Sequence, residues 1–204
     1  RFKVVGDNML EIVLATRNQD KIREIEKLLN GIDAKLLSLD DFPGCPEVAE
    51  DGETLEANAK KKALAVSQYT KKHSLAEDTG LEVEALGGAP GIHSARFAGD
   101  NSTYEDNNRK LLKLMERFSL GERRAKFRCV AALAKPEGGV VTCEGICEGI
   151  IAFEMKGNSG FGYDPLFLLP EYGKTFAELG EEMKNKISHR ARALTKIKEI
   201  INKL

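Results

Sequence analysis

Short apolar segments with strand character alternate along this chain with amphipathic helical segments. The first, EIVLAT at 11–16, holds β-branched residues and no helix breaker, which is typical of a buried strand. The next, QDKIREIEKLLN at 19–30, places apolar residues at helical spacing and ends before Gly31, a residue type common just after a helix. A chain that opens in this way is expected to build an α/β fold.

The following segments continue the alternation. AKLLSL at 34–39 is an expected strand, and the alanine-rich segment TLEANAKKKALAVSQYTKK at 54–72 is an expected helix. HSLAED at 73–78 and LEVEAL at 81–86 are interpreted as two strands on either side of a Thr-Gly pair. The first half of the chain therefore predicts strands and helices in turn.

The second half adds an antiparallel element. The segment at 102–118 predicts a helix capped by a serine or a threonine. AKFRCVAALAKP at 125–136 and VVTCEGICEGIIAF at 140–153 both have strand patterns, and the Glu-Gly-Gly between them suits a hairpin. The segment at 188–204 ends as an amphipathic helix. The predicted class is mixed α/β, with antiparallel hairpins inside an otherwise α/β pattern.

Length and charge limit the possible partners. The chain has 204 residues, enough for one domain or two closely packed lobes. Its 31 lysines and arginines nearly balance its 32 aspartates and glutamates. No global field therefore attracts nucleic acid or an anionic membrane surface, and neither is expected as a partner. No apolar run reaches the roughly 18 residues that a membrane-spanning helix needs.

Cysteine usage and the N-terminal segment predict a cytoplasmic location. The cysteines have neither C-x-x-C spacing nor a nearby histidine pair, so they predict no zinc site and fit a reduced compartment. The N-terminus lacks the apolar core and cleavage site of a signal peptide. Residues 1–9 are expected to be a remnant or an extension, followed by a single two-lobed domain over 10–204.

TRNQDK at 16–21 marks the junction between the first strand and the first helix. Such junctions bind anions, because unpaired backbone N–H groups and the helix dipole both favour negative charge. Thr16 and Asn18 can donate hydrogen bonds, and Lys21 supplies positive charge. The segment lacks the glycines of a Walker A loop. A helix cap at Asn18 with a solvated Lys21 is an equally good interpretation of this motif alone.

AEDTG at 76–80 brings two carboxylates to the end of an expected strand. Because neighbouring strand residues point to opposite faces, Glu77 and Asp78 are not expected to act as a pair, and only one needs to enter a site. A carboxylate in this place can hold Mg²⁺ and accept a proton from water. An acidic turn is the alternative interpretation.

An acidic loop precedes the helix expected at 54–72. It contains Glu47, Glu50, Asp51 and Glu53. Mg²⁺ sites need only one or two protein carboxylates, since waters and substrate phosphates complete the coordination. One loop carboxylate that faces Asp78 would therefore suffice, and most of the other charges are expected to be solvated.

Two further segments combine polarity with an unusual position. SHR at 188–190 places His189 and Arg190 in the first turn of the last helix, where cations oppose the helix dipole unless an anion binds between them. GNSGFGYDPLF at 157–167 combines three glycines with Phe161 and Tyr163, which could form a platform for a flat heterocycle. A turn whose aromatic residues pack in the core is the alternative for this stretch.

Six segments follow one another in the order of the motifs of a known family. They are LATRNQDKIREI, EDGETLEANAKKKA, LAEDTGLEVEALGGAPGIHSARFAG, GFGYDPLF, KTFAEL and KNKISHRARAL. In this order they resemble the inosine triphosphate pyrophosphatase family, whose members hydrolyse XTP, ITP and dITP. The resemblance runs from about residue 10 to the C-terminus. It departs mildly at AED, where many members have ADD, and at Thr79, where many have serine.

The resemblance implies a fold and a reaction. The implied fold is an elongated α/β structure of two lobes around a long mixed sheet, with the nucleotide in the cleft between the lobes, usually as a homodimer. The implied reaction is Mg²⁺-assisted attack of water on the α-phosphorus, which gives a nucleoside monophosphate and pyrophosphate. The related septum-associated nucleotide pyrophosphatases and a nucleotide-binding regulatory module without turnover are the alternatives. The intact SHR and GFGYDP segments disfavour the septum-associated enzymes. The presence of Asp78 and of the acidic loop disfavours a module without turnover.

The resemblance also implies roles for individual residues. Asp78 would be the metal-bound general base and Glu50 the second metal ligand. The phosphates would lie at 16–21, with the backbone contributing, and the nucleoside at 161–164. The implied substrate-binding residues are Thr16, Arg17, Asn18, Gln19, Asp20, Lys21, Lys62, Thr79, Phe161, Gly162, Tyr163, Asp164, Lys184, His189 and Arg190.

Overall fold

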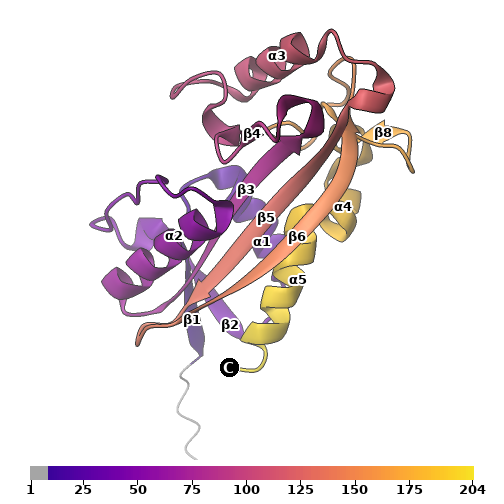
Figure 1. The fold of residues 1–204 in the computed structure, drawn as a ribbon. Helices are drawn as coiled ribbons and strands as arrows, with labels where there is room; N and C mark the ends of the chain where they lie inside the picture. Colours follow the sequence, from indigo (N-terminus) through magenta and orange to yellow (C-terminus); the bar gives the residue numbers. More distant parts are fainter. Residues whose placement is uncertain (1–8) are drawn as a thin grey trace, which may run out of the picture.

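The computed structural model describes residues 9–204, which form one eight-stranded sheet with helices on both sides (Figure 1). The strands are β1 (Leu10–Leu14), β2 (Ala34–Leu37), β3 (His73–Val83), β4 (Pro90–Gly91), β5 (Arg124–Ala134), β6 (Val140–Ile151), β7 (Phe167–Leu169) and β8 (Lys174–Thr175). The helices are α1 (Gln19–Leu28), α2 (Leu55–Thr70), α3 (Tyr104–Met115), α4 (Phe176–Ile187) and α5 (His189–Ile201). The extension expected at residues 1–9 lies, apart from Met9, outside the described residues.

The sheet is mixed. Its strand order is β2-β1-β3-β5-β6-β7-β8, and β4 pairs with β3 off this path. β1 runs parallel to both β2 and β3, whereas β3, β5, β6, β7 and β8 pair antiparallel in succession. The mixed α/β class and the β5–β6 hairpin predicted from the sequence are therefore confirmed.

One strand prediction is wrong. The segments at 73–78 and 81–86 do not form two strands, because β3 runs without interruption from His73 to Val83. Thr79 and Gly80 pair with Cys129 and Arg128 of β5. A Cβ at Gly80 would lie 2.6 Å from the carbonyl oxygen of Gly91, so this glycine permits the close approach of β4 and does not break the strand.

Helix α4 was not expected from the sequence. It begins at a capping box in which Thr175 and Glu178 bond each other's backbone N–H groups. Gly180 interrupts it with a φ of 78°, which only glycine adopts readily, and this interruption breaks the apolar periodicity.

The long strands β3, β5 and β6 connect two lobes (Figure 1). In the lobe that holds β1 and β2, α1 and α5 cover one face of the sheet and α2 covers the other. In the other lobe, α3, β7 and the start of α4 pack around Phe127, Phe167 and Phe176. The predicted two-lobed arrangement is confirmed, and the middle of β3 lies between the lobes. Among residues 9–204 no helix is both long and apolar enough to cross a bilayer.

Candidate active site

A cleft between the two lobes collects most of the predicted site residues. We call it the central cleft. The predicted residues that line it are Asn18, Lys21, Glu50, Asp78, Thr79, Phe161, Gly162, Tyr163, Asp164, Lys184, His189 and Arg190. The side chains of Ser94, Tyr104, Asn107 and Phe127, which the sequence did not single out, also line it. Thr16, Arg17, Gln19, Asp20 and Lys62 do not line it.

The loop before α1 is organised by Asn18. Its side-chain Oδ1 accepts hydrogen bonds from the backbone N–H groups of Asp20 and Lys21, at 2.9 and 3.2 Å, and so caps the helix. Thr16 Oγ1 in turn accepts from the backbone N–H of Asn18 at 3.1 Å. The helix cap at Asn18 is therefore confirmed, but the solvated Lys21 of the same interpretation is not, and Asn18 faces the cleft as well.

The other residues of this loop point elsewhere. Arg17 and Gln19 are exposed, and the guanidinium of Arg17 lies 3.6 Å from the carboxylate of Asp40. Asp20 pairs with Arg23 on the surface of α1. Lys21 is not a free surface residue, because its Nζ lies 2.8 Å from Oε1 of Glu77.

Strand β3 sends its two neighbouring carboxylates in different directions, as the sequence predicts. Glu77 is buried against Lys21 and against Arg190, whose guanidinium lies 3.3 Å away. The hydroxyl of Thr79, two residues on, also donates to Glu77. Burial alone would raise the pKa of Glu77, but Arg190 and Lys21 outweigh it and hold that pKa well below its usual value.

Asp78 faces a different cation, Lys62 of α2. The Lys62 ammonium lies 2.6 Å from Oε1 of Glu50, 3.4 Å from Oδ1 of Asp78, and donates to the backbone carbonyl of Glu77 at 2.8 Å. Burial raises the pKa of Asp78, and the Lys62 charge only partly opposes this effect. The side chain of Asp78 is therefore held as a buried, relatively basic carboxylate.

The carboxylates of Asp78 and Glu50 fit a divalent cation. The buried Oδ2 of Asp78 has no hydrogen-bond partner among residues 9–204, so one acceptor oxygen is available for a ligand. In that range no cluster of three or more histidine, cysteine, aspartate or glutamate side chains is arranged for a metal. Mg²⁺ needs no more than one or two carboxylates when phosphate oxygens and waters complete its shell, so a pair suits Mg²⁺ held jointly with a triphosphate.

A buried charged cluster continues from Glu77 along the cleft through Arg190, and one of its members was not predicted from the sequence. Glu24 of α1 accepts from Lys184 at 2.6 Å and also pairs with Arg190, while Lys184 pairs with Asp164 at 2.6 Å. Lys184 and Arg190 are only 3% and 2% exposed. The anion that the SHR segment requires is thus supplied by the protein itself, through Glu24 and Glu77.

One sequence signal could have identified Glu24. Lys21, Glu24, Ile25 and Leu28 follow helical spacing, and Ile25 lies in the core, so Glu24 occupies a position on the inward stripe of α1. A carboxylate there must be paired, because an isolated buried charge is costly. Burial raises the pKa of Glu24, but Arg190 and Lys184 together hold it below its usual value.

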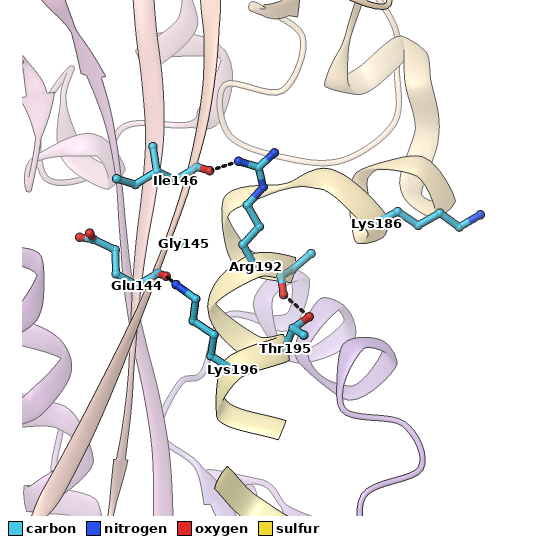
Figure 2. A pocket seen from close by; sticks show the side chains of 8 residues that line it. Glu144, Gly145, Ile146, Lys186, Arg192, Thr195 and Lys196 are labelled. Carbon is cyan, nitrogen blue, oxygen red and sulfur yellow. Dashed lines mark hydrogen bonds between the residues drawn. The ribbon is translucent and has the colours of Figure 1, made fainter. Parts of the chain in front are cut away.

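The start of α5 is fixed by its contact with β6. A Cβ at Gly145 would lie 2.0 Å from the carbonyl oxygen of His189, so only glycine lets the helix approach this closely. Arg192 donates to the carbonyl of Ile146 at 2.7 Å and Lys196 to that of Glu144 at 2.6 Å (Figure 2). These surface cations therefore hold α5 against the strand, which sets the positions of His189 and Arg190.

His189 is a neutral, buried member of the cleft wall. Its ring stacks on Phe127 with centroids 4.5 Å apart and an interplanar angle of 14°. Burial and the nearby Arg190 and Lys184 charges hold its pKa well below its usual value. Its Nδ1 is buried and has no hydrogen-bond partner among the described residues, and the same holds for Nε of Arg190.

The two aromatic residues of the glycine-rich loop have different environments. Tyr163 is 4% exposed and its hydroxyl donates to the carbonyl of Ser94 at 2.8 Å, so it packs in the core as well as lining the cleft. Phe161 is only partly buried, and its ring lies under the Lys184 ammonium at 4.6 Å and the Arg190 guanidinium at 5.4 Å. Asp164 fixes the loop by accepting from the backbone N–H of Phe161 at 2.9 Å.

Comparison with protein families agrees with this arrangement. Residues 12–200 match the model of the Ham1 family. The chain belongs to the Ham1 family. Relatives in this group include a protein named dITP/XTP pyrophosphatase from Desulforamulus reducens, which is 53% identical over 96% of this chain and 97% of its own length. A protein of the same name from Geobacter sulfurreducens is 50% identical over 94% of this chain and 96% of its own length.

Solved structures of Ham1 proteins have the same fold. The structure of a HAM1 protein from Coxiella burnetii aligns with a TM-score of 0.88 and 39% identity, and covers 96% of this chain and 100% of that one. A structure described as nucleoside-triphosphatase / dITP/XTP pyrophosphatase from Mycobacterium abscessus aligns with a TM-score of 0.75 and 39% identity, over 92% of this chain and 98% of that one. The family resemblance found in the sequence motifs is therefore confirmed.

Proposed function

We propose that this Ham1-family chain hydrolyses non-standard purine nucleoside triphosphates, namely ITP, dITP and XTP, to the monophosphate and pyrophosphate. Relatives that cover nearly all of the chain carry the name dITP/XTP pyrophosphatase. The observation that carries the proposal is the division of the central cleft. One end has the buried carboxylate of Asp78 near two lysines, and the other has an aromatic ring with paired cations.

At the phosphate end, the chain offers charge and a base. Lys21 would neutralise phosphate oxygens, and the dipole at the N-terminus of α1 also favours negative charge. Lys62, which does not line the cleft, would hold Glu50 and Asp78 in place. A Mg²⁺ ion held by Asp78 and Glu50 would stabilise the negative charge that develops on the triphosphate. Asp78, whose pKa is raised by burial, is suited to orient and deprotonate the attacking water.

At the base end, Nδ1 of His189 and Nε of Arg190 are buried without a hydrogen-bond partner among the described residues, and they suggest how the enzyme selects a purine. Nε of Arg190 is a permanent donor that no described residue satisfies, and a 6-carbonyl of hypoxanthine or xanthine would accept from it. Adenine presents an amino donor at the same position, which would leave Arg190 Nε unsatisfied at a cost. Phe161, Lys184 and neutral His189 complete the base end and are proposed to contact the nucleoside.

Two alternatives have less support. The related septum-associated enzymes would act on modified pyrimidine nucleotides, yet the SHR and GFGYDP segments both lie in the cleft of this chain. A binding module without turnover would not need Asp78 and Glu50 beside a lysine. We further propose a homodimer in the cytoplasm. The dimer is supported by the family resemblance and by the frequency of two-fold pairing, and the location by the cysteine usage.

The direct test is to follow ITP hydrolysis with Mg²⁺ in ¹⁸O-labelled water. The proposal predicts IMP and pyrophosphate as products, with the label in IMP, because water attacks the α-phosphorus. Label in pyrophosphate would place the attack on the β-phosphorus. IDP and phosphate as products, or no turnover with and without Mg²⁺, would contradict the proposed function.

A further inference from the structure

Tyr104, the first residue of α3, connects the two ends of the central cleft. Its hydroxyl donates to Oδ2 of Asp20 at 3.1 Å and accepts from Nδ2 of Asn18 at 3.2 Å. Its ring lies against Phe161, with centroids 5.9 Å apart and an interplanar angle of 39°. The side chain is 41% exposed and also lines the cleft. One residue of α3 therefore touches both the loop at the start of α1 and the aromatic ring of the base end.

A second contact ties the start of α3 to the glycine-rich loop. Asn108, one turn along the helix, is 3% exposed, and its Nδ2 donates to the carbonyl of Tyr104 at 2.9 Å and to that of Gly162 at 2.8 Å. Gly162 follows Phe161 directly. A movement of the loop that holds Phe161 must therefore shift the start of α3 or break these hydrogen bonds.

Asn18, the partner of Tyr104 at the phosphate end, is also held in one orientation by hydrogen bonds. Oδ1 of Asn18 is used by the backbone N–H groups of Asp20 and Lys21, so the amide orientation is fixed and Nδ2 is the donor left for Tyr104. Lys21 follows in the same turn and lies 2.8 Å from Glu77. The Tyr104 hydroxyl thus influences the position of the groups that would meet phosphate.

We propose that Tyr104 is a positioning residue that couples base binding to phosphate binding. The inference rests on the proposed function. A purine that enters beside Phe161 displaces this ring from the Lys184 and Arg190 cations, and the ring presses on Tyr104. The hydroxyl transmits this shift to Asn18. Binding of hypoxanthine or xanthine then improves the placement of the phosphates. Part of the preference for these bases over adenine is therefore a difference in kcat and not only in KM.

The first test measures the coupling without hydrolysis. The affinity of inosine is measured by calorimetry with and without saturating tripolyphosphate, in the wild-type protein and in Tyr104→Phe. Coupling between two sites of one protein is typically about 5–150-fold, and we expect at least about fivefold tightening in the wild type. Tyr104→Phe keeps the ring and loses the hydroxyl, so the factor should fall below about twofold. No coupling in the wild type, or equal coupling in both proteins, would overturn the inference.

The second test uses turnover. Tyr104→Phe is expected to lower kcat for ITP by about tenfold, and to reduce the ratio of kcat for ITP to kcat for ATP, because the hydroxyl no longer links α3 to Asn18 and Asp20. Tyr172→Phe is the matched control, because Tyr172 has a similar exposure, 39% against 41%, and does not line the central cleft. A Tyr104→Phe enzyme with wild-type kcat values for both nucleotides would refute the role of Tyr104 while leaving the proposed function intact. A wild-type protein inactive on ITP would refute the proposed function, and the calorimetry would still decide the coupling.

Discussion

Replacing Glu24 with glutamine is expected to lower the free energy of unfolding by about 3 kcal/mol. Three carboxylates, Glu24, Glu77 and Asp164, balance three cations, Lys21, Lys184 and Arg190, in the buried cluster. The substitution keeps the shape of the side chain but leaves one positive charge in excess. Removing one partner of a buried ion pair costs about 3–5 kcal/mol. The lower end applies, because Lys184 and Arg190 each retain a second carboxylate.

The measurement is urea denaturation of the two proteins at pH 7, followed by thermal unfolding. A loss of 3 kcal/mol corresponds to a fall of roughly 6–12 °C in Tm for a domain of this size. Glu26→Gln is the matched control, since Glu26 is an exposed residue on the same helix, and its effect should stay within about 0.5 kcal/mol. Equal stability of the Glu24 and Glu26 variants would show that the cluster is not a tightly paired buried network.

Three further predictions concern the cleft. Asp78→Asn should reduce kcat for ITP by roughly 10²–10⁴. Its Tm at pH 7 should stay at or above the wild-type value, because burial raises the pKa of Asp78 and the ionised form therefore costs stability above that pKa; a lower Tm would contradict this reasoning. Glu77→Gln should raise KM for ITP by about tenfold and reduce stability, because it releases Lys21 and Arg190, and an unchanged KM would show that Glu77 does not position them. Because the pKa of His189 is held well below 6.5, the unfolded chain binds a proton that the folded chain does not, and stability is lost as pH falls below about 6.5. In His189→Asn the unfolding free energy should therefore fall less steeply between pH 6.5 and 5, by about 1.4 kcal/mol per pH unit. Urea denaturation at three pH values measures this slope, and a variant that keeps the wild-type slope would refute the reasoning.

Local periodicity predicts most of the fold. The segments that form β1, α1 and the β5–β6 hairpin each contain a complete hydrophobic pattern within a few residues. Their secondary structure can therefore be predicted without knowing what they pack against. The interruption expected at Gly80 could not be judged in this way. The glycine there is required by the carbonyl of Gly91, which approaches from another strand and leaves no mark on the local pattern.

The site was only partly predictable for a related reason. Asp78, Lys21 and Arg190 follow from their places at element ends and from the family resemblance. Glu24 and Tyr104 depend on partners that only the fold brings near, as the contact between Glu24 and Lys184 joins residues 160 positions apart. The sequence alone does not show which distant residues pair. A charged residue on the inward stripe of a helix can therefore be recognised, but its partner cannot be named.

The most direct test of the account is a comparison of kcat/KM for ITP, XTP, GTP and ATP, measured as pyrophosphate release with Mg²⁺. Mispaired buried polar groups can discriminate by factors of about 10⁴–10⁵, and imperfect desolvation of the base is expected to leave only part of this. The proposed function predicts values for ITP and XTP at least roughly a hundredfold above those for ATP and GTP. It also predicts that Arg190→Ala narrows the gap to ATP, because the Nε donor to the 6-carbonyl is lost. Guanine carries the same carbonyl, so the gap to GTP requires a second donor near position 2, which would oppose the amino group of guanine. Comparable values for all four nucleotides in the wild-type protein would contradict it.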